Sequence, residues 1–435
     1  MKRFCKTLVF VLLLVLVVLL AALSPPVRYY RAAASLLWQL QSPAAEGWFT
    51  RNVAERVARL GLNPVRTELR TISTPQPLTA RFYYPVGRDH APAVIVLHGV
   101  HHLGIEEPRL VAFATALSAH GFLAITPELR DLADYRVTPE TIQSIGECAH
   151  FVHESSGRPA TIIGLSFAGG LTLMAAAEAR WRNDIGLVLA VGAYDDLQRV
   201  LEYYATNLVV WPSGKVTMLP AHEYGPLVAV YDYPQEFFSA RDVPAARTAL
   251  RELLWEKRDL AQTDARQLSP QGQQFFELLF QHHIDVLSPV LLRGIRQYHD
   301  MLAAISPHGH LADLQASVYL LHGAADDVVP PSETEWLERD IPPRCLRMAL
   351  ISPVISHLEL SATPTLTDKL TLVHFMSDFL RDAQNPQHAP FWRISGRVPH
   401  QPTFGSLGRK HVGPDAPGWA SEVSEESMCV RFGNT

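Results

Sequence analysis

The sequence lacks a basic excess, a cysteine framework and an internal repeat. With 38 Lys and Arg against 43 Asp and Glu, its formal net charge is −5, so no positive field would hold a polyanion. Its four cysteines, Cys5, Cys148, Cys345 and Cys429, lie far apart without CxxC spacing. No glycine-rich loop carries the lysine that a P-loop requires. We therefore expect no nucleic-acid partner, no disulfide scaffold and no cysteine zinc site.

The N-terminus begins with basic residues and continues as an apolar run from Leu8 to Leu23, which Ser24-Pro25-Pro26 follow. A helix of this length spans about 24 Å, slightly less than a bilayer core. Cleavage after Ser24 would leave a proline next to the cut, which suits a signal peptide poorly. We predict an uncleaved transmembrane anchor over residues 1–24, with the N-terminus in the cytoplasm and the body outside it. Secretion after signal cleavage is the alternative.

Residues 25–60 are predicted to form juxtamembrane helices. From Tyr29 to Leu40, apolar side chains recur on one helical face, together with aromatic and basic residues that suit a membrane interface. A helix that packs on the folded domain would show the same pattern. Both interpretations stay open.

A regular alternation of strands and helices follows. Two segments between Val65 and Val86 are rich in Thr, Val, Ile and Tyr and predict a leading hairpin. The later strands are predicted at Ala93–Leu97, Phe122–Thr126, Thr161–Leu165, Ile185–Val191, Ser317–Leu321 and Arg347–Ile351. The helices between them are predicted at Glu107–His120, Thr138–Glu154, Ala168–Arg180 and Glu333–Glu338. This alternation indicates a mostly parallel sheet covered by helices on both faces.

Two helix starts in the C-terminal part carry capping signals. Ser332 and Glu335 have the spacing of a capping box. The final helix is predicted to open at Thr363-Pro364. Its residues Leu366, Leu370, Val373 and Phe379 are expected to face the core.

The alternation breaks between about Asp196 and Ser306, where the sequence is mostly helical in pattern and rich in aromatic residues. We interpret residues 197–306 as an inserted cap that separates the core segments 61–196 and 307–383. Residues 384–435 are rich in Pro, Gly, Ser and His without periodicity, which predicts a disordered tail.

Ser166, in the stretch IIGLSFAGG, stands between a predicted strand and a predicted helix. Gly164 and Ala168 are small enough to permit a sharp turn from strand to helix, which is how a nucleophile elbow exposes its serine hydroxyl. The usual pattern is G-x-S-x-G, and Ala168 departs from it at the last position. A serine that only caps the following helix is the alternative interpretation.

The stretch VIVLHGVHHLG and the stretch YLLHGAADDVVP complete a pattern that resembles the α/β-hydrolase superfamily over residues 93–383. The resemblance implies an oxyanion loop after His98-Gly99, with the backbone NH groups of Val100 and Phe167 as donors. We expect the His98 side chain to hold this loop in place. A metal site at His98, His101 and His102 is disfavoured because no carboxylate or cysteine nearby completes a ligand set.

The same resemblance assigns Asp326 as the acid of a catalytic triad and His357, just past the last strand, as its base. The chain order Ser, Asp, His fits the family. Asp195 or Asp196, after the preceding strand, is a rival acid, and a turn-capping role for Asp326 is a further alternative.

The expected fold is therefore an α/β-hydrolase fold: a mostly parallel sheet flanked by helices, a helical cap between the sixth and seventh strands, and an N-terminal transmembrane helix. The expected activity is hydrolysis of carboxylic esters, with esters of lipophilic acyl chains as the narrower hypothesis, through an acyl-enzyme and without a cofactor. A peptidase or an acyltransferase would use the same triad, and an inert binding protein of the same fold is the alternative of another class. The expected partners are a small-molecule ester and the membrane; the sequence predicts no oligomeric state.

Overall fold

The structure is a computed structural model that describes residues 25–40, 62–355 and 364–386. The predicted anchor, the predicted tail and His357 lie outside these residues, so they stay predictions. Within the described ranges, no helix is both long and apolar enough to cross a bilayer.

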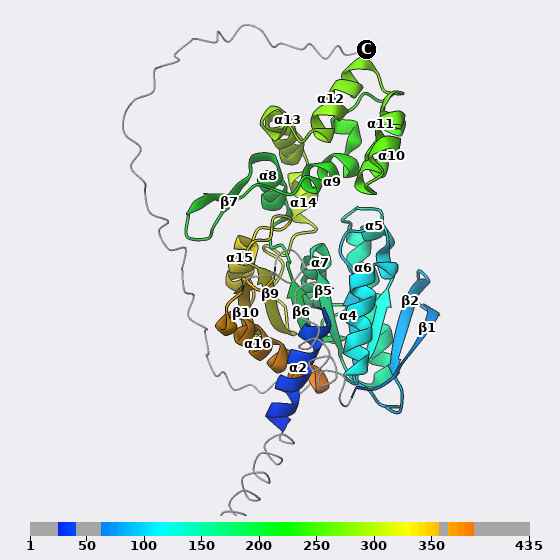
Figure 1. The fold of residues 1–435 in the computed structure, drawn as a ribbon, viewed down its shortest axis with the longest axis vertical. Helices are drawn as coiled ribbons and strands as arrows, with labels where there is room; N and C mark the ends of the chain where they lie inside the picture. Colours follow the sequence, from blue (N-terminus) through cyan, green and yellow to red (C-terminus); the bar gives the residue numbers. More distant parts are fainter. Residues whose placement is uncertain (1–24, 41–61, 356–363, 387–435) are drawn as a thin grey trace, which may run out of the picture. The chain divides into compact units, whose positions relative to one another are not determined.

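One large sheet contains eight strands in the order β1-β2-β4-β3-β5-β6-β9-β10 (Figure 1). The pairings β1 with β2 and β2 with β4 are antiparallel, and those from β4 through to β10 are parallel. The predicted leading hairpin and the predicted parallel sheet are thus confirmed. The strands are β1 (Val65–Ile72), β2 (Leu78–Pro85), β3 (Ala93–Leu97), β4 (Leu123–Pro127), β5 (Ala160–Leu165), β6 (Ile185–Val191), β9 (Ser317–Gly323) and β10 (Leu346–Ser352).

The central strands are apolar throughout because helices cover both faces of the sheet. In β3, Val94 and Val96 belong to one apolar cluster, while Ile95 and Leu97 belong to the other. The first cluster includes side chains of α2 (Pro25–Leu40), α4 (Pro108–Ala119) and α16 (Leu366–Gln384). The second includes side chains of α6 (Pro139–Ser156), α7 (Phe167–Ala177) and α15 (Ser332–Asp340). Short helices η2 (Gly104–Glu106) and α5 (Arg130–Ala133) lie in connecting loops. This architecture fits the α/β-hydrolase fold.

Between β6 and β9 the chain forms a set of helices and one small hairpin, and in Figure 1 these helices gather beyond one end of the large sheet. The helical character of this insertion was expected, whereas its hairpin was not. Its elements are α8 (Leu197–Thr206), β7 (Leu208–Val210), β8 (Val216–Met218), α9 (Tyr224–Asp232), η3 (Pro234–Glu236), α10 (Val243–Leu254), α11 (Arg258–Ala265), α12 (Pro270–Phe280), α13 (Ile284–Gln297) and α14 (His299–Ala303).

Helix α2 packs on the folded domain, which is one of the two interpretations that the sequence left open. Ala33 and Leu36 are fully buried in the cluster that α4 and α16 also line. Tyr30 stacks on the ring of His374 in α16, with 5.8 Å between ring centroids. Its hydroxyl lies 2.5 Å from His374 Nδ1.

The expectation for the final helix was partly wrong. The helix begins at Leu366, and Thr365 caps it through a capping box with Asp368. Leu366 and Leu370 are 72% and 59% exposed. The buried stripe has the spacing of one helical face, and Leu366 and Leu370 fall outside it. That stripe consists of Leu372, Phe375, Met376, Phe379, Leu380 and Ala383.

The capping box expected at Ser332 and Glu335 does not form. Ser332 is already the first helical residue of α15, so its side chain cannot occupy the cap position. Pro331 holds that position without a side-chain cap. The Ser332 hydroxyl is instead buried, without a hydrogen bond to the described residues.

Replacing Leu36 with alanine tests the packing of α2. Because Leu36 is fully buried, Leu36→Ala should lower the free energy of unfolding by about 2–5 kcal/mol. Val27→Ala, at an exposed position of the same helix, should change it by less than about 0.5 kcal/mol. Urea unfolding of the full chain, followed by tryptophan fluorescence, measures both. Equal midpoints for the two variants would contradict the packing.

Candidate active site

Ser166 connects β5 to α7 with an unusual backbone. Its φ of 54° and ψ of −128° lie where residues other than glycine are rarely found, at a cost of about 1–3 kcal/mol. Hydrogen bonds hold this turn: Ser166 N donates to Val191 O at 2.7 Å, and Gly169 N donates to Ser166 O at 2.8 Å. The Ser166 hydroxyl is buried and makes no hydrogen bond within the described part of the chain. Ser166 stands at the N-cap position of α7, but its side chain makes no cap bond, which removes the simple capping interpretation.

Two glycines let the helix approach the strand at this turn. A Cβ on Gly164 would lie 2.7 Å from Gly169 Cα and 2.8 Å from Ala168 O. A Cβ on Gly169 would lie 2.7 Å from the Ala193 Cβ. Ala168 itself is buried. The departure from G-x-S-x-G at Ala168 is therefore compatible with the elbow, because the close backbone contact falls on Gly164 and Gly169.

The loop after β3 lies against Ser166. A Cβ on Gly99 would lie 3.2 Å from Ser166 Cβ and 3.8 Å from Ser166 Oγ. Val100 follows Gly99 in this loop, and Phe167 follows Ser166 as the first residue of α7. Both predicted oxyanion donors thus belong to segments that adjoin Ser166.

His98 holds this loop, as expected from the sequence. Its Nδ1 lies 2.8 Å from Gly99 O, and its Nε2 lies 3.0 Å from Leu129 N. The pattern requires Nδ1 to donate and Nε2 to accept, which makes the ring neutral. Burial lowers the pKa of His98, in agreement with a neutral ring.

The other two histidines of the loop have partners of their own. His101 Nδ1 accepts a hydrogen bond from Leu103 N at 3.2 Å. His102 Nδ1 lies 3.2 Å from the Tyr135 hydroxyl, and its ring lies 5.3 Å from that of Trp255. His101 thus bonds within its own loop, and His102 contacts Trp255 of the cap.

Asp326 lies in the turn after β9 and is fully buried. Its Oδ1 accepts hydrogen bonds from the amides of Val328 and Val329, both at 2.9 Å. Its Oδ2 lies 3.5 Å from His322 Nε2. One oxygen thus caps the turn, as the alternative interpretation expected, and a triad acid would use the other.

The rival acids have structural partners. Asp196 caps α8 by accepting a hydrogen bond from Gln198 N at 2.9 Å. Asp195 Oδ2 accepts one from Arg199 Nη2 at 2.8 Å. Because His357 lies outside the described residues, the triad that would join it to Ser166 and Asp326 stays a prediction.

The cap contacts both loops that surround Ser166. The Tyr224 hydroxyl of α9 donates to Val100 O at 3.2 Å, beside the predicted oxyanion donor. The Tyr203 hydroxyl of α8 donates to Asp327 O at 3.0 Å, next to the predicted acid. Burial raises the pKa of both phenols, so they stay neutral donors. The cap is therefore hydrogen-bonded to both loops that adjoin Ser166.

No protein-family model and no curated protein matches the chain. The chain is similar in structure to brefeldin A esterase, described as a bacterial homologue of human hormone-sensitive lipase, with 13% identity and a TM-score of 0.43 over 84% of this chain and 87% of that one. It is also similar to a serine hydrolase from Cycloclasticus zankles, with 13% identity and a TM-score of 0.39 over 73% of this chain and 99% of that one. An acylaminoacyl peptidase from Pyrococcus horikoshii shows 10% identity and a TM-score of 0.42 over 77% of this chain and 43% of that longer chain.

Adding a methyl group at Gly164 tests the contact between strand and helix at the elbow. Gly164→Ala should lower the free energy of unfolding by about 1–3 kcal/mol, because the new Cβ overlaps backbone atoms of α7. Ala168→Gly is the matched control: it adds no atom and should cost about 1 kcal/mol through its helix propensity. Guanidinium unfolding compares the two. A Gly164→Ala protein as stable as the wild type would contradict the packing described.

Proposed function

We propose that this chain is a serine hydrolase that cleaves carboxylic esters through an acyl-enzyme. The observation that carries the proposal is the strained Ser166, whose buried hydroxyl has no hydrogen-bond partner among the described residues. Strain of this kind persists where the surrounding structure enforces it, and it is frequent at active sites. A buried hydroxyl without a partner is costly in a purely structural serine.

In the proposed mechanism, Ser166 attacks the acyl carbonyl and His357 accepts its proton, then protonates the leaving alcohol. Asp326 orients His357 and stabilises its cation. The amides of Val100 and Phe167 donate to the oxyanion, and the positive end of α7 adds to this stabilisation. Water then attacks the acyl-enzyme and releases the acid.

We infer a lipophilic acyl group from the cap. A small apolar pocket lies among the cap helices. Two phenols, Tyr233 and Tyr298, share its lining with aliphatic and aromatic side chains. Its apolar lining residues are Leu201, Ala229, Phe237, Leu291, Ile295 and Leu302. A space of this kind suits hydrocarbon better than a charged or peptide-like group.

Covalent labelling by a fluorophosphonate tests the nucleophile. The wild-type chain should be labelled, and Ser166→Ala should not. Ser332→Ala is a matched control, because Ser332 is also buried with a hydroxyl that has no hydrogen bond among the described residues but is the first residue of helix α15. It should keep full labelling. Asp326→Asn and His357→Ala should lower kcat by on the order of 10³-fold or more.

Two results would overturn the assignment of Ser166. One is equal labelling of wild type and Ser166→Ala. The other is a folded wild-type chain that no fluorophosphonate labels, which would favour a binding protein without catalytic activity.

A series of p-nitrophenyl esters from acetate to decanoate tests the acyl preference. Each added methylene that is buried should raise kcat/KM by up to about fourfold, because it contributes about 0.8 kcal/mol. Ala229→Leu, which narrows the cap cavity, should reduce the rate for octanoate more than the rate for acetate. If kcat/KM did not change along the series, or if Ala229→Leu affected both esters equally, this cavity would not be the acyl-binding site. The assignment of Ser166 as nucleophile would stay intact.

A further inference from the structure

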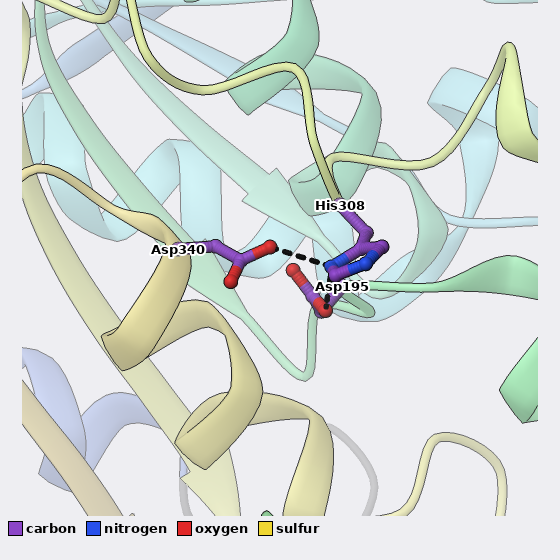
Figure 2. Close-up of side chains that lie close together, drawn as sticks. All are labelled: Asp195, His308 and Asp340. Carbon is purple, nitrogen blue, oxygen red and sulfur yellow. Dashed lines mark hydrogen bonds and ion pairs between the residues drawn. The ribbon is translucent and has the colours of Figure 1, made fainter.

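Three side chains from distant parts of the sequence meet where the cap joins the core (Figure 2). Asp195 follows β6, His308 follows α14 at the end of the cap, and Asp340 is the last residue of α15. His308 Nδ1 lies 2.7 Å from Asp340 Oδ2 and 3.6 Å from Asp195 Oδ2. One ligand-type atom from each residue lies within 4.8 Å of the other two.

The Asp195 carboxylate is held so that one of its oxygens has no partner. Its side chain is fully buried, and Oδ2 accepts a hydrogen bond from Arg199 Nη2 at 2.8 Å. Oδ1 is also buried and makes no hydrogen bond with the described residues. In Figure 2 the Asp195 carboxylate is directed toward the Asp340 carboxylate and the His308 ring. A buried carboxylate oxygen without a donor is costly, and a cation at this point would satisfy it.

Arg199 and Glu333 form a second layer behind Asp195. Arg199 Nε donates to Glu333 Oε1 at 2.6 Å, and the amide of Asp195 donates to Glu333 Oε2 at 3.0 Å. These bonds fix the arginine, which in turn fixes the Asp195 carboxylate. Metal-binding carboxylates are commonly oriented by such hydrogen bonds.

The cluster carries more negative than positive charge. Arg199 contacts both Asp195 and Glu333, and Asp340 adds a third carboxylate nearby. A divalent cation would offset the repulsion among these carboxylates.

We propose that Asp195, His308 and Asp340 bind one divalent transition-metal cation, with Zn²⁺ as the best match. Two carboxylates and one imidazole are borderline ligands that suit Zn²⁺ better than Ca²⁺ or Mg²⁺. Two ligand atoms at about 2.0–2.2 Å from zinc lie roughly 3–3.5 Å from each other. The distances from His308 Nδ1 to Asp340 Oδ2, 2.7 Å, and to Asp195 Oδ2, 3.6 Å, bracket this range. Water would complete the coordination on the side of the partly exposed His308.

The bound cation would fasten the end of the cap to the core. Asp195 and Asp340 belong to the core, whereas His308 begins the segment that returns from the cap. The site is therefore structural in role. It is independent of the proposed attack by Ser166.

Calorimetric titration of the chelator-treated full chain with Zn²⁺ tests this site. The wild type and Ser166→Ala should bind the cation equally, which separates the site from the hydrolase proposal. His308→Ala and Asp340→Asn should weaken this binding at least tenfold. His310→Ala is the matched control, because His310 lies in the same loop but contacts Ser306 O at 2.9 Å. It should bind like the wild type.

Thermal unfolding provides the second readout. Zn²⁺ should raise the Tm of the wild type and of His310→Ala, and should raise it less in His308→Ala and Asp340→Asn. Asp340→Asn preserves the shape of the side chain, so it tests the site even if His308→Ala does not fold. A wild type that neither binds Zn²⁺ nor gains stability from it would show that the cluster is only an ion pair between His308 and its two carboxylates. Undiminished Zn²⁺ binding by both variants would equally overturn the proposal.

Discussion

The backbone conformation of Ser166 is the constraint on which the rest of the site depends. A residue with a side chain at φ 54° and ψ −128° is stable only where its neighbours leave no alternative. Those neighbours are Val191 at the end of β6, whose carbonyl accepts a hydrogen bond from the Ser166 amide, and Gly169 in the first turn of α7, whose amide donates to the Ser166 carbonyl. Gly164 and Gly169 allow strand and helix to come close enough for both bonds. The parallel pairing of β3, β5, β6 and β9 brings the loops after β3, β5 and β9 to the same end of the sheet as Ser166.

The cap is joined to this edge at both of its ends. The Tyr194 hydroxyl, just before the cap, donates to Ile305 O at 2.6 Å, and Leu197 N donates to Ser306 Oγ at 2.9 Å. The insertion therefore leaves and re-enters the core at one point. Because Tyr203 and Tyr224 also bond the loops beside Ser166, cap and site form one packed unit. A movement of the cap helices α8 or α9 would thus shift the loops that carry the predicted acid and the predicted oxyanion donor.

The parts that sequence predicted well are those in which local pattern and tertiary environment agree. The strand Ala93–Leu97 was predicted with its observed bounds because this apolar run is too short for a typical helix and rich in β-branched residues. The role of His98 was also predicted, since a histidine beside a turn readily bonds backbone groups on both sides. The phase of α16 was misjudged because Leu366 and Leu370 are apolar yet exposed, and an apolar residue on a surface looks the same in sequence as one in a core. The β7–β8 hairpin was missed because its strands are only three residues long.

Sequence could not reveal the cluster around Asp195 at all, since its members are brought together only by the return of the chain from the cap. The free-energy cost of burying these charged side chains nevertheless requires an explanation. Burying Asp195 and Glu333 against Arg199 gains little stability over apolar residues of the same size, because desolvation offsets most of the attraction. What such a network does supply is a fixed geometry, since each hydrogen bond satisfied excludes other arrangements of the cap on the core. A cation bound by Asp195, His308 and Asp340 would satisfy the remaining buried oxygen and turn a costly group of charges into the point that fixes the cap.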